Sequence, residues 1–479
     1  MKNGGEYNPI FEGLQDIFQN QNFLSRKATA LKVESTSPKT DESMFLSGLF
    51  IILVLLFLIL SKRMSALAAL ILVPVGGALL SGYGSDTFTF AVAGIQSIAP
   101  VVAMFVFAIL FFSLLKDTGL FDPIIRGILG RVGKNPAWIT LGTALLAMTV
   151  HFDGSGATTF LITIPALLPL YEELNMDRRV LACIVSLAAG TMNMVPWGGP
   201  TLRAATALEV SVNELYAPLL IPQLGGLLFV LGVAWWLGRR EAKRLGHTTG
   251  MENALPDTEH IYRTIDEETA ALRRPGMLWF NALLAVAVLV ILITGWIPPA
   301  LVFMLGFITA LLLNYPNQTE QKNRIMAHAQ AAILMAAILL AAGVFTGIMK
   351  ESGMLTAMAE QATQWIPREA GSHLPTMLAV CSMPLSFAFD PNSFYFGLLP
   401  VLAQTGIEFG IPPATMGHAA LMGQMTTGFP VSPLTASTFL LIGLAKVDLA
   451  DHQRYTFGYA FLTSLVMTLI AILIGVIPL

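Results

Sequence analysis

The sequence predicts an all-α, polytopic membrane protein, and two observations carry this prediction. Hydrophobic residues make up 55% of the 479-residue chain and charged residues only 12%, with a mean hydropathy of +0.68, whereas a soluble domain carries about 25% charged residues. In addition, eight apolar runs have about the 20-residue length of a membrane-spanning helix: 44–60, 64–82, 94–115, 215–238, 277–296, 299–315, 326–349 and 455–478.

Two further apolar runs, 180–210 and 414–445, are long enough to span but are interrupted. The first contains the sequence PWGGP at 196–200, and the second contains GFPVSP at 428–433. Proline removes a helix hydrogen-bond donor and glycine loosens the backbone. Each run is therefore predicted to be a broken helix, in which two half-helices are joined by an unwound link.

Two pairs of shorter apolar runs flank a Phe-Asp sequence: 137–150 with 159–170, and 375–389 with 394–403. None is long enough to span a bilayer, so we expect two re-entrant hairpins, 137–170 and 375–403. Their tips at membrane depth would hold Asp153 and Asp390. A carboxylate at that depth costs about 2.5–3.5 kcal/mol even on the mildest insertion scale. Two such carboxylates indicate one functional reason used twice.

A charged segment, 239–274, divides the chain into two halves that we expect to be repeats, 44–238 and 275–479. Each half contains three spans, a hairpin, a broken helix and a last span. Local matches recur in the same order: KDTGL at 116–120 with KESGM at 350–354, Asp153 with Asp390, Gly190 with Gly423, and Pro200 with Pro433. An odd number of crossings makes the halves inverted. Inverted repeats with broken helices predict a secondary transporter with its substrate near the midplane.

Basic residues predict the orientation, because cytoplasmic loops carry an excess of Lys and Arg. Ten spans with both termini outside place the seven basic residues of 239–274 in a cytoplasmic linker. The polar tail, 1–43, conflicts with this orientation, because it carries five basic residues. We interpret it as a native extension or an expression remnant. The expected location is the cell membrane, as a multi-pass protein of the bacterial inner membrane.

Three stretches resemble the citrate–divalent metal:proton symporter family (CitMHS) of the ion transporter superfamily: HFDGSGATTF at 151–160, IPALLP at 164–169 and MNMVPWGGPTLR at 192–203. The resemblance implies proton-driven uptake of citrate complexed with a divalent metal such as Mg²⁺ or Ca²⁺. The metal is then part of the substrate, and no permanently bound cofactor is expected. The superfamily fold implies a homodimer in which a mobile transport domain works as an elevator against a scaffold. The superfamily's Ser-Asn-Thr tips are replaced here by DGS at 153–155 and DPNS at 390–393, so its sodium sites do not transfer residue by residue.

A metal–citrate complex retains little net charge, so its site needs hydrogen-bond donors but few cations. Helix N-termini supply N–H groups and a partial positive charge, and half-helices are expected to begin after Pro200 and after Pro433. Trp197, in the first link, is expected either to line the substrate pocket or to pack at an interface. The predicted substrate-binding residues with neutral or small side chains are Ser155, Thr158, Asn193, Gly198, Gly199, Thr201, Asn392, Ser393, Thr426, Thr427, Ser432 and Thr435.

Arg203 is the one arginine that the predicted topology assigns to membrane depth. We interpret it as a clamp for a substrate carboxylate, because guanidinium matches carboxylate in two-pronged geometry. Two alternatives are a structural partner for Asp153 or Glu209, and a side chain that reaches the outer interface.

Asp153 and Asp390 are candidate proton carriers, because a buried carboxylate can exchange its proton as substrate arrives. They are alternatively direct ligands of the metal cation, or caps of the following half-helix. His151 titrates near neutrality and either helps to transfer protons or forms a structural hydrogen bond. Because His151 and Arg203 are expected near the first tip, we expect Asp153 to lie on the side of the substrate's carboxylates. Asp390 is then expected to do more of the cation binding or proton transfer.

The sequence excludes some other functions and leaves others open. The sequence has no Walker motif, no Gly-x-Ser-x-Gly, no His-Glu-x-x-His and no structural-zinc spacing, so no enzyme is predicted. The net charge of −3 gives no argument for nucleic acid. A sodium-coupled di- or tricarboxylate transporter on the same fold is the first alternative. A sodium/proton antiporter of the same superfamily leaves Arg203 hard to explain, and a channel or a non-transporting receptor is the alternative from another class.

Overall fold

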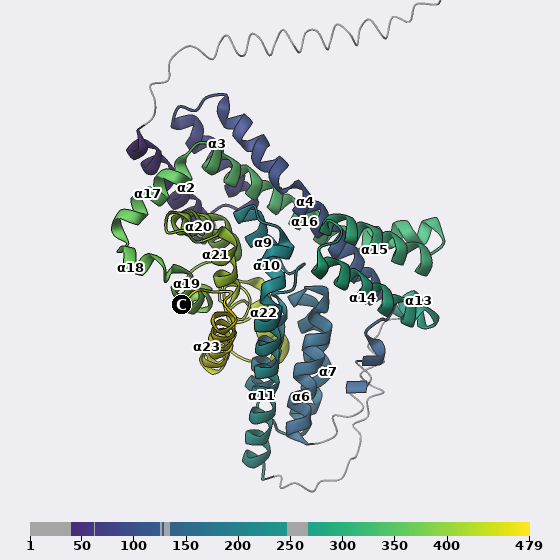
Figure 1. The fold of residues 1–479 in the computed structure, drawn as a ribbon. Coiled ribbons are helices and arrows are strands. Elements are labelled where there is room, and N and C mark those ends of the chain that lie inside the picture. Colours follow the sequence, from purple (N-terminus) through teal and green to yellow (C-terminus); the bar gives the residue numbers. More distant parts are fainter. Residues whose placement is uncertain (1–39, 62, 125–126, 129–134, 247–266) are drawn as a thin grey trace, which may run out of the picture.

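The structure is a computed structural model that describes residues 40–61, 63–124, 127–128, 135–246 and 267–479. Within these ranges the chain forms helices and turns and no strand (Figure 1). Six described segments are long and apolar enough to cross a bilayer: Asp41–Ile59, Asp86–Asp117, Val212–Arg244, Pro275–Leu292, Gln318–Glu351 and Leu449–Leu473. The prediction of an all-helical, multi-pass membrane protein is confirmed. Nearly all of the predicted 1–43 tail lies outside the described residues, as does much of the 239–274 linker.

The first half contains the following helices: α2 (Asp41–Leu60), α3 (Ala66–Leu80), α4 (Asp86–Asp117), α6 (Pro136–Val150), α7 (Gly156–Glu173), α8 (Arg178–Met192), α9 (Gly199–Leu208), α10 (Val212–Tyr216) and α11 (Leu220–Arg244). A 3-10 turn, η2 (His151–Asp153), joins α6 to α7, and another, η3 (Ala217–Leu219), joins α10 to α11. Because α11 continues through Arg244, the first residues of the predicted linker extend a helix.

The second half contains these: α13 (Glu267–Leu272), η4 (Pro275–Met277), α14 (Leu278–Thr294), α15 (Pro299–Asn314), α16 (Gln318–Glu351), α17 (Met354–Trp365), α18 (Arg368–Gly371), α19 (Leu374–Leu385), η5 (Ser393–Leu398), α20 (Leu399–Glu408), α21 (Pro413–Leu421), α22 (Ala436–Ala445) and α23 (Leu449–Leu473). The segment η5 has π-helical hydrogen bonding. The first limb of this hairpin ends at Leu385, four residues before the predicted run does, and turns follow at 386–388.

Both proline- and glycine-rich interruptions lie between separate helices. Residues 193–198 lie between α8 and α9 and are called the first link. Residues 422–435 lie between α21 and α22 and are called the second link. Residues 151–155 and 389–393 are called the first and second tips. The links leave backbone groups outside regular helices, so the side chains around them must satisfy those groups.

The long helices α4 and α16 lie side by side across the molecule (Figure 1). At one end a Cβ added to Gly94 would lie 2.0 Å from the carbonyl oxygen of Gly343, so glycine permits this close approach. At the other end Asp117 of α4 lies 3.3 Å from Arg324 and 2.7 Å from His328, both near the start of α16. The two helices are therefore antiparallel.

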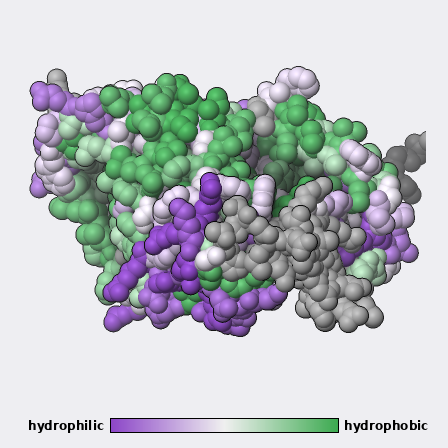
Figure 2. Space-filling view, turned by 90° about the horizontal axis from the view of Figure 1, so that it is seen from below, coloured by the Kyte–Doolittle hydropathy of each residue, from purple (hydrophilic) through white to green (hydrophobic). Residues whose placement is uncertain are grey.

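On the face that Figure 2 shows, hydrophobic side chains cover much of the upper part, and hydrophilic ones gather in the lower part and at both sides. Along α14 the exposed side chains Trp279, Leu283, Val286 and Val290 follow helical spacing on one face. An apolar stripe of this kind suits contact with lipid rather than water.

Candidate substrate site

One cavity of about 350 Å³ lies where both tips and both links meet. Arg203 and Asp390 are the charged residues among those that line it. The full lining is Gly154, Asn193, Gly199, Pro200, Arg203, Asp390, Pro391, Asn392, Met425, Phe429, Leu434, Thr435, Ala436 and Ser437. The cavity thus unites segments that lie more than two hundred residues apart in the sequence.

Two helix N-termini face this cavity. Gly199 and Pro200, in the first turn of α9, line it, and so do Thr435 and Ala436 at the start of α22. Each of these helices is ten residues long. Their first N–H groups have no partner within the helix and carry a partial positive charge. The two ends therefore offer donors to an anion with no added side-chain charge.

Arg203 lies one turn into α9 and is 8% exposed. Its Nε donates to Asn392 Oδ1 at 3.0 Å, and Nη2 lies 3.6 Å from Met335 Sδ. A Cβ added to Gly199 would lie 2.7 Å from Nη1, so this glycine leaves room for the guanidinium. The remaining donors of the fork are available to a ligand in the cavity.

The placement of Arg203 differs from the expected one. We expected it near the first tip, but it contacts Asn392 of the second tip. The two acids suggested as structural partners are paired elsewhere, Asp153 with Lys116 at 3.7 Å and Glu209 with Lys350. The reason is that α9 leads away from the first link toward the second hairpin, and sequence proximity does not report that direction.

The first tip uses its polar groups to build the turn. Asp153 Oδ1 accepts from the backbone N–H of Ser155 at 2.8 Å, and Ser155 Oγ accepts from the N–H of Thr158 at 3.3 Å. Gly154 has a φ of +74°, in the region that favours glycine. The Lys116 ammonium lies 3.7 Å from Asp153 Oδ2 and 3.5 Å from Thr158 Oγ1. Of this group only Gly154 lines the cavity.

At the second tip the aspartate also accepts backbone N–H groups, but proline follows it where the first tip has a left-handed glycine, and the chain enters a helix at once. Asp390 Oδ1 accepts from the N–H groups of Asn392 at 2.9 Å and Ser393 at 3.3 Å, and Ser393 Oγ donates to Oδ2. Asp390 lines the cavity itself, with Asn392 and Arg203. Asp390 is therefore placed as the capping alternative describes and also lines the cavity. Asp153 accepts only within its turn, and the residue that caps α7 is Ser155.

His151 lies behind the cavity wall. It is fully buried, with Nδ1 2.9 Å from Thr159 Oγ1 and Nε2 3.5 Å from Asn193 Oδ1. Asn193 in turn donates to the carbonyl of Met425 at 2.8 Å and lines the cavity. His151 thus joins the first tip to both links through one asparagine, in the hydrogen-bonded position that its structural alternative describes.

Half of the eight predicted hydroxyl ligands donate to carbonyl groups near the links. Four of them donate to backbone carbonyls: Thr201 to Met194 at 2.9 Å, Thr426 to Leu421 at 3.0 Å, Ser432 to Ser386 at 2.5 Å, and Thr435 to Phe429 at 2.8 Å. Of these four only Thr435 lines the cavity. Thr427 Oγ1 is buried with no hydrogen-bond partner among the described residues, and Gly198 serves the tight turn, where a Cβ would lie 2.2 Å from the Asn193 carbonyl oxygen.

Trp197 packs rather than lining the cavity. Its ring stacks on Phe112 of α4 at 4.2 Å between centroids, and its Nε1 donates to the Phe152 carbonyl at 2.9 Å. The carbonyl of Phe389, the equivalent residue of the second tip, lies 3.5 Å from Gln424 Nε2. In both halves the carbonyl before the tip aspartate therefore accepts from a side chain of a link.

Eight lining residues are not among the predicted site residues: Gly154, Pro200, Pro391, Met425, Phe429, Leu434, Ala436 and Ser437. Met425 has a φ of +53°, unusual for a residue other than glycine. Phe429 belongs to the predicted interruption, and Ser437 follows the start of α22. Closeness to the predicted interruption 428–433 was a usable signal for Met425, Phe429 and Ser437 alike, because each lies within four residues of it.

No group of three or more His, Cys, Asp or Glu side chains suited to holding a metal occurs among the described residues. The cavity contributes one carboxylate, Asp390, and two carboxamides, Asn193 and Asn392. Oxygen ligands of this kind suit Mg²⁺ and Ca²⁺, which need six or more ligands. A metal entering this cavity would take most of its ligands from its own anion or from water.

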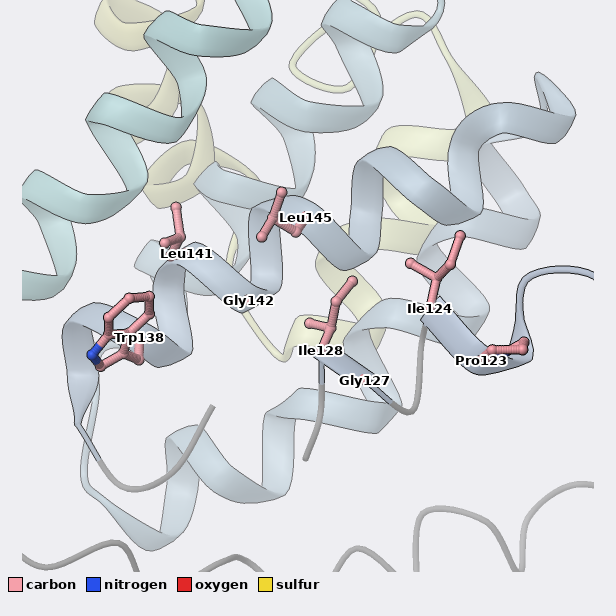
Figure 3. A pocket seen from close by; sticks show the side chains of 8 residues that line it. All are labelled: Pro123, Ile124, Gly127, Ile128, Trp138, Leu141, Gly142 and Leu145. Carbon is pink, nitrogen blue, oxygen red and sulfur yellow. The ribbon is translucent and has the colours of Figure 1, made fainter. Parts of the chain in front are cut away.

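A second cavity, of about 310 Å³, lies between α6 and the segment after α4 (Figure 3). Its lining is apolar and includes Ile124, Ile128, Trp138 and Leu145. Among the described residues, no charged side chain lines this cavity.

Comparisons with known proteins agree on one family and one fold. The family model described as "Citrate transporter" (CitMHS) matches residues 51–423. A citrate transporter of Bacillus subtilis (strain 168) is 44% identical over 90% of this chain and 98% of its own length. A Mg(2+)/citrate complex secondary transporter of the same organism is 38% identical with the same coverage. The solved YdaH transporter of Alcanivorax borkumensis has a TM-score of 0.59 at 14% identity, covering 90% of this chain and 98% of its own, and supports the fold alone.

Proposed function

We propose that this chain, which belongs to the citrate transporter family, carries citrate as its complex with a divalent metal ion across the cell membrane. Members of the family are secondary transporters, so the prediction that the chain is not an enzyme is confirmed. The metal of the proposed complex follows the name of one relative, which transports a Mg(2+)/citrate complex.

The proposal rests on one observation: some groups that line the cavity suit an anion, and others suit a cation. Arg203 and the two helix N-termini suit carboxylates, whereas Asp390 and Asn392 suit a hard cation. A free tricarboxylate would meet the Asp390 charge, and a free cation would meet Arg203. An anion that brings its own divalent metal satisfies both sides at once, so Arg203 is assigned to a substrate carboxylate and Asp390 to the metal side.

Proton coupling is the second part of the proposal. Asp390 faces the cavity with no ammonium group paired to it among the described residues, whereas Asp153 has Lys116 beside it. A carboxylate that contacts substrate can give up its proton when the metal arrives and take it back when the metal leaves. Asp390 is therefore the better candidate for the proton carrier, and His151 remains a candidate for proton transfer.

The third part is an inverted-repeat architecture that works as an elevator in a homodimer. The repeats 44–238 and 275–479 are supported by the equivalent ends of α9 and α22. Glu209 and Lys446 both end their helices with a φ of +54°. Each is followed by valine and then by a residue that caps the next helix, Ser211 or Asp448.

The test is uptake of labelled citrate into proteoliposomes that contain the purified protein. Uptake is measured with Mg²⁺, Ca²⁺, Zn²⁺ or Fe²⁺, with and without a proton gradient, and in the absence of sodium. We expect uptake to require a divalent metal, to collapse with a protonophore and to ignore sodium. Uptake of metal-free citrate at the same rate, or uptake that requires sodium, would contradict the proposal.

A further inference from the structure

Two lysines at equivalent positions, one in each half, lie at opposite ends of the α4–α16 pair. Lys116 lies in the last turn of α4 and Lys350 in the last turn of α16. Because the two helices are antiparallel, these last turns are at opposite ends of the pair. Lys116 pairs with Asp153 of the first tip, and Lys350 pairs with Glu209 at the end of α9.

At the first end, α4 is attached to the first tip and first link. The Lys116 ammonium lies 3.7 Å from Asp153, whose side chain is 4% exposed. Phe112, one helical turn earlier on the same face, stacks on Trp197. The last two turns of α4 therefore combine an apolar contact with an ion pair.

At the other end, α16 is attached to the end of α9. Lys350 pairs with Glu209, the residue at which α9 ends, and Ser97 of α4 donates to the same carboxylate at 3.2 Å. Helix α9 carries Arg203 and presents its N-terminus to the cavity. The end of α9 that faces away from the cavity is thus held by both long helices.

A third lysine provides a contrast. Lys446 ends α22 as Glu209 ends α9, and it lies 3.1 Å from Glu172 near the end of α7. The exposure of the two pairs is similar, 57% and 33% for Lys446 and Glu172 against 54% and 21% for Lys350 and Glu209. The Lys446 pair, however, joins α22, which follows the second link, to α7, which follows the first tip. It involves neither α4 nor α16.

We propose that Lys116 and Lys350 are positioning residues whose ion pairs fix the depth of the substrate site along α4 and α16. This inference rests on the proposed function, in which the site moves relative to a fixed part of the protein. An ion pair adds a specific, directional contact that defines one position of the two elements it joins. The Lys350–Glu209 pair is partly exposed and contributes little to stability, so it can break and re-form in each transport cycle, whereas the Lys116–Asp153 pair involves a buried carboxylate and is more costly to break.

The decisive experiment is a reducible cross-link across the second attachment. Cys183 and Cys381 are replaced by alanine, and Lys350→Cys is combined with Glu209→Cys. The matched control combines Lys446→Cys with Glu172→Cys. A bifunctional thiol reagent of the length of the ion pair joins each cysteine pair, and counterflow of labelled citrate with Mg²⁺ is measured before and after reduction.

We expect the cross-link between positions 350 and 209 to stop counterflow and reduction to restore it, while the control cross-link leaves most of the activity. Stabilisation of the cross-linked protein against heat by Mg²⁺ and citrate should persist, because the cavity is unchanged. Normal counterflow in the cross-linked 350–209 variant would overturn the inference. Failure of the uncross-linked protein to be stabilised by Mg²⁺ and citrate would instead contradict the proposed function.

Single substitutions give a second measurement that does not depend on cross-linking. Lys116→Met and Lys350→Met should lower the maximal rate of citrate transport by about two- to fivefold, with little change in KM. Lys350→Arg, which keeps the charge, should restore the rate. Lys446→Met should leave the rate unchanged. Equal effects of all three methionine variants would overturn the inference, because a general loss of surface charge would then suffice.

Discussion

The two tips each hold an aspartate that accepts a backbone N–H group, but the neighbours of the two carboxylates differ. At the first tip Asp153 lies beside Lys116 and does not line the cavity, whereas at the second tip Asp390 lines the cavity with Arg203. Both carboxylates accept from a backbone N–H two residues later. The comparison shows that two aspartates with a common local hydrogen bond can have different side-chain partners.

The neighbours differ because the two halves deliver different helices to the tips. The end of α4 brings Lys116 to the first tip, and α9 brings Arg203 to the second. The equivalent of Lys116 in the second half, Lys350, reaches Glu209 rather than Asp390. The second tip is therefore left without an ammonium partner in the described structure, and its carboxylate can meet a substrate cation.

The largest expected effect is that of Arg203→Ala. A charged donor to a substrate carboxylate contributes about 1.5–3 kcal/mol, so the affinity for Mg²⁺–citrate should fall by about 10- to 100-fold. Arg203→Lys should lie in between, because it retains the charge but loses the fork. The measurement is citrate binding by calorimetry, with Arg240→Ala as the control, since Arg240 lies over Trp236 on the surface of α11. Wild-type affinity in Arg203→Ala would remove the carboxylate clamp.

The next effect compares the two aspartates directly. We expect Asp390→Asn to lose proton-driven accumulation of citrate while it retains some exchange, because the neutral amide cannot carry a proton. Asp153→Asn should accumulate citrate at a lower rate, because it leaves Lys116 without its carboxylate. Accumulation is followed in proteoliposomes with an imposed proton gradient. If both variants accumulate citrate in a pH-dependent way, neither aspartate is the proton carrier.

The sequence predicted those features that depend on neighbouring residues. Proline and glycine mark both links, because they act on the local backbone, and the Phe-Asp sequences mark both tips. The partner of Arg203 could not be predicted, because it depends on the direction in which α9 leaves the first link. The hydroxyl groups misled for a related reason. Backbone carbonyls at helix ends and links also need donors, so Thr201, Thr426 and Ser432 donate to the carbonyls of Met194, Leu421 and Ser386.

A smaller effect is expected where each link contacts its tip. Trp197→Phe keeps the ring but removes the Nε1 donor to the Phe152 carbonyl, which should cost about 1 kcal/mol of stability. The corresponding change at the second tip, Gln424→Met, should cost more, because Gln424 also accepts from Ser386 Oγ at 3.0 Å. Thermal unfolding in detergent measures both. A larger loss for Trp197→Phe would mean that the first tip, and not the second, is the more tightly held.

The smallest effects are expected for substitutions of the two tip serines, Ser155 and Ser393. Ser155→Ala removes the cap of α7 and should cost about 1 kcal/mol of stability, with no change in the KM for citrate, because Ser155 does not line the cavity. Ser393→Ala removes a donor to Asp390 and should lower the uptake rate by about threefold and change its pH dependence. Uptake between pH 5 and 8 in both variants is the measurement. Identical pH profiles would mean that Ser393, like Ser155, serves only the turn, and that the difference between the tips depends on Arg203 and Lys116 alone.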